Sequence, residues 1–249
     1  MATWNPWHGC RKVSPGCLNC CVYRRDAEFG KDSSFIARTS SFDLPVKRNR
    51  KGIYKLQPDE GAVYTCMTSD FFVEEADEWR PEAWKMIRER DDLHFVIITK
   101  RIHRFQVGLP KDWGEGYDNV TICCTCENQN RADYRLPIFL NLPIRHRTII
   151  HEPMLEWIEI RRYLATGLIE QVTCGGESGP EARICDYAWI LDTMQQCVEH
   201  NVPFWFKQTG AKFKKGSRVY HIKRKDQMSQ AEKAGVNYRF GSNMFNQDR

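Results

Sequence analysis

The chain has 249 residues, of which 41% are hydrophobic and 28% charged, and its formal net charge is +5. This length is enough for one large α/β domain or for two small ones with a substantial buried core. No apolar run approaches the roughly 18 residues of a membrane span, and residues 1–6 lack the basic and apolar segments of a signal peptide, so we expect a cytoplasmic protein with no membrane partner. In that reducing compartment, we do not expect the eleven cysteines to pair as disulfides, and their cluster points to metal ligation or catalysis.

The first distinctive segment is CRKVSPGCLNCC, residues 10 to 21, in which Cys10, Cys17 and Cys20 are separated by six and then two residues. A glycine precedes Cys10 and another precedes Cys17, which lets the backbone approach a bulky inorganic group closely. These residue types are compatible with two kinds of metal site, a zinc ion or an iron-sulfur cluster. A structural zinc ion needs four ligands, which His8 or Cys21 would complete. Three thiolates on a 4Fe-4S cluster would leave one iron open to a substrate or cofactor.

Six apolar, β-rich runs follow, with helical periodicity between several of them. The predicted strands are residues 62–67, 94–99, 119–124, 147–151, 170–176 and 203–207, with a short extra strand before Cys10, and the clearest predicted helices are 81–90, 129–140 and 186–200. Strands that are continuously apolar and joined by helices indicate a parallel sheet covered on both faces. We therefore predict one domain over residues 1–240, with a cluster-binding loop at residues 8–21 and a disordered tail at residues 241–249.

Polar side chains follow every predicted strand. They are Ser69-Asp70, Lys100-Arg101, Glu127-Asn128, Glu152, Glu177-Ser178 and Lys207-Gln208. Each one alone is explained equally well by a loop or a helix cap, but six in succession indicate a shared pocket at the carboxyl ends of barrel strands. Because the chain is short for eight strand and helix units, we predict a partial, open (β/α)6 barrel of the TIM type.

Basic residues are concentrated near the C-terminus, at Lys212-Phe213-Lys214-Lys215 and at Lys223-Arg224-Lys225. Such a patch could contact the phosphates of a nucleic acid. A solvated basic surface is the simpler interpretation, because runs of charge are usually exposed faces.

The segment TWNPWHGCRKVSPGCLNCC resembles the opening of a three-cysteine-motif family that was first described from phage gene products. Further motifs in this chain continue the resemblance: MTSDFF, ITKR, CENQNRADYRLP, HEP, GGESGPEAR and PFWFKQTG. Most members have an aromatic residue and alanine after the last cysteine, where this chain has Cys21-Val22. The family in turn is similar to atypical radical S-adenosylmethionine enzymes, with a longer first spacing between the cysteines.

The resemblance implies a partial (β/α)6 barrel of the radical S-adenosylmethionine type, in which Cys10, Cys17 and Cys20 hold a 4Fe-4S cluster. An external electron donor would reduce the cluster, and reductive cleavage of S-adenosylmethionine would give a 5′-deoxyadenosyl radical that abstracts a substrate hydrogen. The residues implied in cofactor binding are Gly175, Gly176, Glu177 and Ser178, with Lys100, Glu127, Glu152, Lys207 and Gln208 as further candidates. The substrate is unknown, and a nucleic acid or nucleotide is the class to test first.

Two other functions compete with this interpretation. The first is a zinc-binding module that recognises nucleic acid without catalysis. The second is a metal-independent barrel hydrolase that uses paired carboxylates such as Glu127 and Glu152.

Overall fold

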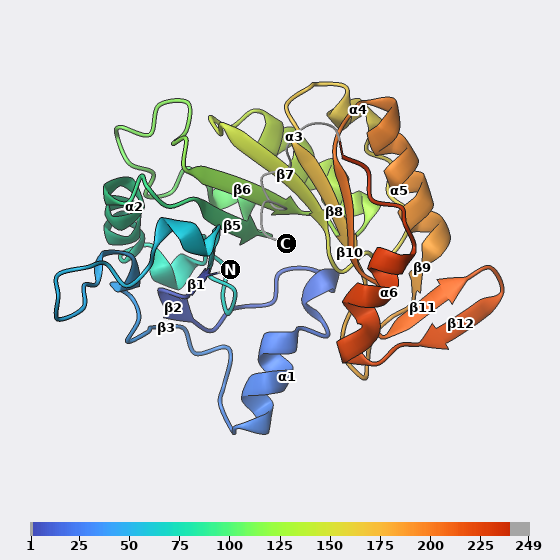
Figure 1. Cartoon of the computed structure of the whole chain (residues 1–249), viewed down its shortest axis with the longest axis horizontal. Helices are drawn as coiled ribbons and strands as arrows, with labels where there is room; N and C mark the ends of the chain where they lie inside the picture. Colours follow the sequence, from blue (N-terminus) through green and yellow to red (C-terminus); the bar gives the residue numbers. More distant parts are fainter. Residues whose placement is uncertain (1, 240–249) are drawn as a thin grey trace.

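The computed structural model describes residues 2–239, and its centre is a seven-stranded parallel sheet that curls into a half-barrel (Figure 1). The strands are β1 (Ala2–Trp4), β4 (Val63–Thr65), β5 (Phe95–Thr99), β6 (Val120–Thr125), β7 (His146–His151), β8 (Gln171–Gly175) and β10 (Phe204–Gln208). They lie side by side in this same order, so each strand pairs with the next one in the sheet, and β1 and β10 form the two edges.

Apolar side chains on both faces explain why the central strands are parallel and buried. All six residues of β6 are buried, and alternate residues along it point to opposite sides. Ile122 belongs to the main core, whereas Cys123 packs with Val96 and Ile150 in a small second cluster on the other face of the sheet. Both faces of the sheet therefore carry buried apolar side chains, with threonines such as Thr121, Thr148 and Thr173 buried among them.

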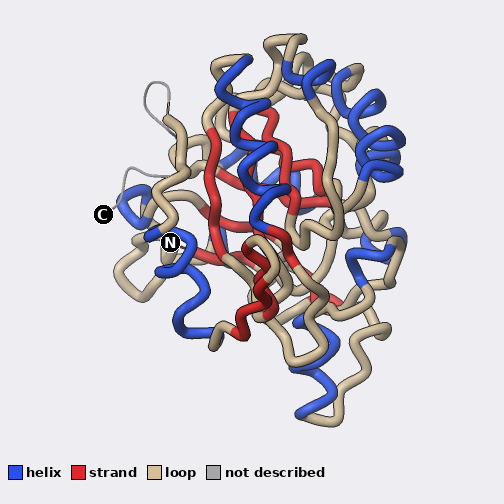
Figure 2. Tube along the Cα trace, turned by 90° about the vertical axis from the view of Figure 1, so that its right-hand side faces the viewer, coloured by secondary structure: helices blue, strands red, loops and turns tan. Residues whose placement is uncertain are grey.

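Helices follow most of the strands. They are α1 (Cys21–Glu28), α2 (Arg80–Glu89), α3 (Gln129–Leu140), α4 (Arg161–Leu164), α5 (Tyr187–Glu199) and α6 (Gln227–Lys233). Local capping sets the start of α3, where the Asn128 side chain accepts from the Arg131 N–H at 3.0 Å. Figure 2, seen from the side of α5, shows this helix lying across the strands. Between β5 and β6 the chain has no α-helix and crosses as a loop with one short 3-10 turn at Ile102–Arg104.

The structure confirms a mixed α/β fold compatible with a partial barrel, with β1 as a seventh strand beside the six expected from the long apolar runs. Several elements were not predicted. They are the antiparallel pair β2 (Trp7–His8) and β3 (Ala37–Arg38), the bridging strand β9 (Cys185–Asp186), and the hairpin of β11 (Lys212–Lys215) and β12 (Arg218–His221). The predicted disordered tail, 241–249, lies outside the described residues. Within residues 2–239, none of the helices has the length and apolarity that crossing a membrane requires.

The ends of β8 and β10 approach each other very closely. A Cβ placed on Gly176 would lie 2.5 Å from the Thr209 carbonyl oxygen and 2.9 Å from the Cys185 Cβ. The first of these atoms belongs to the backbone, which cannot move aside as the end of a flexible side chain can. The Gly175-Gly176 pair therefore lets these two strand ends pack together at the carboxyl edge of the sheet.

Replacing Gly176 with alanine is expected to destabilise the fold by about 1 to 3 kcal/mol, because the new methyl group overpacks this contact. Urea unfolding of Gly176→Ala under reducing conditions measures the change. Gly167→Asn is the matched control, because Gly167 has a φ of 69° and open space around its Cβ position, and asparagine tolerates this conformation. A Gly176→Ala variant as stable as the wild type would show that the two strand ends are not in close contact.

Candidate functional site

The cysteine loop, residues 8–21, lies between β2 and α1 at the carboxyl edge of the half-barrel. Its three predicted ligands, Cys10, Cys17 and Cys20, are partly exposed, and Cys21 is exposed at the first position of α1. The other seven cysteines are buried thiols, as expected for those in the strands. Exposure therefore separates the loop cysteines from all the others.

A buried carboxylate at the end of β6 holds the first half of this loop. Glu127 is fully buried, and it accepts a hydrogen bond from the Gly16 N–H at 3.1 Å and from Arg135 of α3 at 2.7 Å. Burial acts to raise the pKa of Glu127, but the Arg135 guanidinium and the hydrogen bonds from Ser14 and Gly16 outweigh it and hold this pKa below its usual range. A Cβ on Gly16 would lie 3.0 Å from the Glu127 side chain, so the glycine allows this approach.

A second carboxylate, at the end of β8, holds the other half of the loop. Glu177 accepts from the Asn19 side-chain amide at 3.0 Å and from the Arg183 backbone N–H at 2.7 Å. Arg183 also donates to the Pro15 carbonyl at 2.9 Å. Burial opposes ionisation of Glu177, but the hydrogen bonds and charge of Arg183 lower its pKa. Glu177 therefore contacts the cysteine loop itself.

A third contact reaches Cys10 from the ends of β4 and β5. Asp70 accepts from the Thr99 hydroxyl at 2.8 Å and from the Lys100 backbone N–H at 2.9 Å. The buried Arg101 guanidinium lies 3.5 Å from the Asp70 carboxylate, donates to the Cys10 Sγ at 3.5 Å, and donates to the Arg11 carbonyl at 2.7 Å. Burial and then Asp70 raise the pKa of the Cys10 thiol to about 11, while Arg101 acts to lower it.

Asp70 and Arg101 are site residues for which sequence reasoning gave no role. The available signal was their position a few residues after β4 and β5, because polar residues there meet at one edge of a parallel sheet. Lys100 takes part through its backbone N–H.

Three further predicted residues form a cluster of their own where β7 and β10 end. Lys207 Nζ donates to Glu152 Oε2 at 2.7 Å, and Gln208 Nε2 donates to Glu152 Oε1 at 2.5 Å and to the Gly176 carbonyl at 3.0 Å. All three side chains are partly exposed. The structure therefore places Glu152 with Lys207 and Gln208, and places Glu127 and Glu177 with the cysteine loop.

The residue types in the loop fit an iron-sulfur cluster, because its three partly exposed cysteines are the ligands that such clusters take. Tyr23 of α1 donates to the Cys10 carbonyl, and its pKa is raised by burial, then by Cys10 and Cys20, and less by Asp32 and Cys17. Across the part of the chain that the structure describes, no three His, Cys, Asp or Glu side chains are already grouped closely enough to hold a metal ion.

A cavity of about 440 Å³ adjoins the cysteine loop on the side of α1. Its lining includes Cys21, Met67 and Ser178, together with Arg224 from the C-terminal part of the chain. The full lining is Cys21, Val22, Arg24, Arg25, Glu28, Met67, Ser178, Pro180 and Arg224. Ser178 is thus the predicted residue that lines a cavity next to the loop, and we call this space the α1 cavity.

Comparison with protein-family models gives a match over residues 1–240 to a family described as "Protein of unknown function (DUF5131)". The comparison with curated proteins found no match, and neither did the comparison with solved structures.

Replacing Glu127 with glutamine is expected to lower the free energy of unfolding by about 3 to 5 kcal/mol, because it leaves the buried charge of Arg135 without its counter-ion. Urea unfolding of Glu127→Gln measures the loss. Asp112→Asn, which removes the exposed ion pair with Arg88, is the control and should leave the midpoint unchanged. The double variant Glu127→Leu with Arg135→Met should recover much of the lost free energy of unfolding. If Glu127→Gln is as stable as the wild type, the buried ion pair is contradicted.

The ionisation of Glu127 is expected to show in the Gly16 amide. Because the folded pKa is lowered, this carboxylate stabilises the fold at pH values above about 4.3, its usual unfolded pKa, and the contribution is lost as pH falls through the folded pKa. An NMR titration of the Gly16 amide should therefore have a midpoint below about 4.3. The Arg131 amide, bonded to the non-titrating Asn128 side chain, is the control. A midpoint at or above the unfolded value would contradict this assignment.

Proposed function

We propose that this chain, which belongs to the DUF5131 family of proteins of unknown function, is a cytoplasmic radical S-adenosylmethionine enzyme. Cys10, Cys17 and Cys20 would hold a 4Fe-4S cluster that receives its electron from an external donor. The observation that carries the proposal is the cysteine loop: its thiols are partly exposed at the carboxyl edge of a half-barrel, where barrel enzymes place their chemistry.

The contacts of the loop support this proposal. Carboxylates at the ends of β6 and β8 hold the backbone and side chains between Ser14 and Asn19, so the segment that includes Cys17 is held from two sides. The ligand spacing alone would leave such a loop free to move. Buried Glu127 and Glu177 would therefore act as positioning residues for the cysteines.

Arg101 would act on the cluster through Cys10. Its guanidinium donates to the Cys10 Sγ at 3.5 Å, and a donor to a ligand sulfur stabilises negative charge there and raises the reduction potential of an iron-sulfur site. Because Arg101 is almost fully buried, water does not screen this interaction. Arg101 would thus set both the position and the electronic environment of this thiolate.

When bound, the cluster would supply the electron that cleaves S-adenosylmethionine reductively and yields a 5′-deoxyadenosyl radical for hydrogen abstraction. Lys207 and Glu152 offer a cation and a carboxylate at the same edge of the sheet, which are complementary to the carboxylate and amino groups of an amino acid moiety. Ser178 and the backbone of Gly175 and Gly176 would contribute from the end of β8.

A zinc site would need a fourth ligand beside the three cysteines. The His8 Nε2 lies 2.9 Å from the Asp26 carboxylate, and Cys21 lines the α1 cavity. His8 is therefore engaged elsewhere, whereas the Cys21 thiol interacts with the Cys20 thiol and is the fourth ligand that a zinc site would use. The polar strand ends that hold the loop favour the open three-thiol cluster, and a Cys21→Ala variant distinguishes the two sites.

Anaerobic reconstitution with iron and sulfide, followed by electron paramagnetic resonance of the reduced protein, tests the proposal. We expect a 4Fe-4S signal that changes when S-adenosylmethionine is added and that disappears in Cys17→Ala. Cys21→Ala is the matched control, because it removes an adjacent thiol from the same loop and should keep the signal. A colourless protein that binds one zinc ion, or a Cys17→Ala variant with an unchanged cluster signal, would contradict it.

A further inference from the structure

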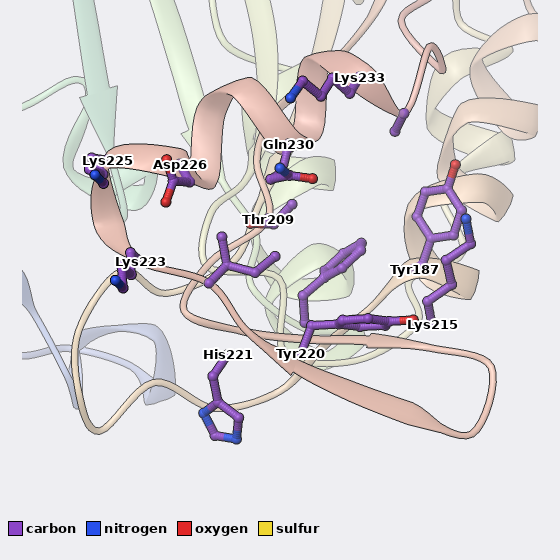
Figure 3. Close-up of a pocket in the computed structure, with 13 residues that line it drawn as sticks. Tyr187, Thr209, Lys215, Tyr220, His221, Lys223, Lys225, Asp226, Gln230 and Lys233 are labelled. Atoms are coloured by element: carbon purple, nitrogen blue, oxygen red, sulfur yellow. The ribbon is translucent and has the colours of Figure 1, made fainter.

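A cavity lies outside the cysteine loop, between the β11–β12 hairpin and α6 (Figure 3). Its volume is about 720 Å³, within the usual range of about 300 to 1,000 Å³ for ligand pockets. It is lined by Tyr187, Thr209, Phe213, Lys215, Tyr220, His221, Ile222, Lys223, Lys225, Asp226, Gln230, Lys233 and Ala234. We call it the lysine cavity.

The lysine cavity carries positive charge that the fold does not neutralise. Apart from Glu232, no carboxylate among residues 2–239 lies within ion-pair distance of Lys215, Lys223, Lys225 or Lys233. Their neighbour Lys214, by contrast, lies 2.7 Å from Asp186. These four ammonium groups share the lining with one carboxylate, Asp226. They repel one another, so an anionic ligand would relieve this repulsion.

Aromatic rings lie beside these lysines. Tyr220 is 41% exposed and faces Phe213 across the hairpin, and the rings of Tyr187 and Phe213 are 5.6 Å apart. Lys215 lies 5.1 Å from the centre of the Tyr187 ring. Figure 3 shows Tyr187, Tyr220 and Lys215 together on one side of the cavity, with Lys223 and Lys225 on the opposite side. An exposed tyrosine in a basic cavity offers a stacking surface as well as charge.

The segment Lys223–Lys225 borders both the lysine cavity and the α1 cavity. Lys223 and Lys225 line the lysine cavity, whereas Arg224 between them lines the α1 cavity. Arg24 and Arg25 of α1 line the α1 cavity as well. The two linings together hold seven Lys and Arg side chains against two carboxylates, whereas the whole chain has 37 against 32. The basic surface is therefore concentrated along this path.

We propose that the two cavities bind one single-stranded nucleic acid, with its phosphates on the lysines and arginines and a base stacked on Tyr220. Basic grooves that follow the backbone, combined with aromatic rings that stack on bases, are the means by which proteins bind single strands without reading their sequence. Such a strand extends from the lysine cavity past Arg224 to the α1 cavity, beside Cys20 and Cys21. A lone nucleotide would occupy the first cavity and leave the three arginines of the second without phosphate.

The binding surface depends on its own charges and rings and not on any cluster. That the bound strand is also the substrate rests on the proposed function, since the α1 cavity adjoins the loop of Cys10, Cys17 and Cys20. The binding experiment needs no cluster, so its failure and a failure to form the cluster are separate results.

Fluorescence anisotropy of the full chain with a labelled 15-nucleotide thymidine strand tests the proposal. Lys223→Gln combined with Lys225→Gln should weaken binding at least tenfold at low salt. It should also reduce the slope of log K against log salt by about 1.4, since each phosphate contact on a single strand contributes about 0.7. Tyr220→Ala should weaken binding about tenfold through lost stacking.

The matched control is Lys85→Gln combined with Lys111→Gln. These exposed lysines line a different cavity, of about 350 Å³, together with Trp84 and Tyr117. The control variant should bind like the wild type. Circular dichroism of each variant shows whether it has folded, and the substituted side chains are all exposed.

Four results would overturn the proposal. The first is that the two double lysine variants weaken binding equally, and the second is that thymidine monophosphate binds as tightly as the strand. The third is that a duplex of the same length binds with equal affinity. The fourth is that polyglutamate displaces the strand at equal charge concentration. The first result would show that the strand binds to exposed lysines in general and not to this surface. The second would assign the site to a free nucleotide, the third to a duplex, and the fourth to charge alone.

Discussion

The buried carboxylate of Glu127 is the contact on which the arrangement of the site depends. It has no access to water, so its charge is sustained by Arg135 and by the hydrogen bond from the Gly16 backbone. Arg135 is fixed in turn by α3, and it also donates to the Thr125 carbonyl at 2.7 Å. One ionised group therefore joins the central strand β6, the helix that follows it and the loop that carries the cysteines.

Two other strand ends complete the support of this loop. Glu177 reaches its second half through Asn19, and Arg101 reaches Cys10 from the opposite side of the half-barrel. Because parallel strands all present their carboxyl ends at the same edge, residues separated by more than 100 positions in the chain meet around one short loop. The polar residues at the ends of β5, β6 and β8 contact the cysteine loop. Glu152, Lys207 and Gln208 contact one another at the same edge of the sheet.

The strands and the main helices were predictable because burial has a simple signature in the sequence. The run Phe95–Thr99 and the run Val120–Thr125 are apolar on both sides, as strands covered on both faces must be. The hairpin of β11 and β12 was not predictable in this way, since all four residues of β12 are exposed and carry no apolar alternation. The hairpin nevertheless contributes Phe213, Lys215, Tyr220 and His221 to the lysine cavity.

The sequence by itself determined the order of the strands, the position of the cysteine loop and the polar residues at each strand end, because these follow from local patterns of apolar residues and spacing. Only the tertiary structure decided which partner each polar side chain meets. Gly16 and Glu127, or Asn19 and Glu177, come together only when the sheet has curled and the loop has closed over its edge. A contact between such distant residues depends on the geometry of the whole half-barrel, which no local period in the sequence records.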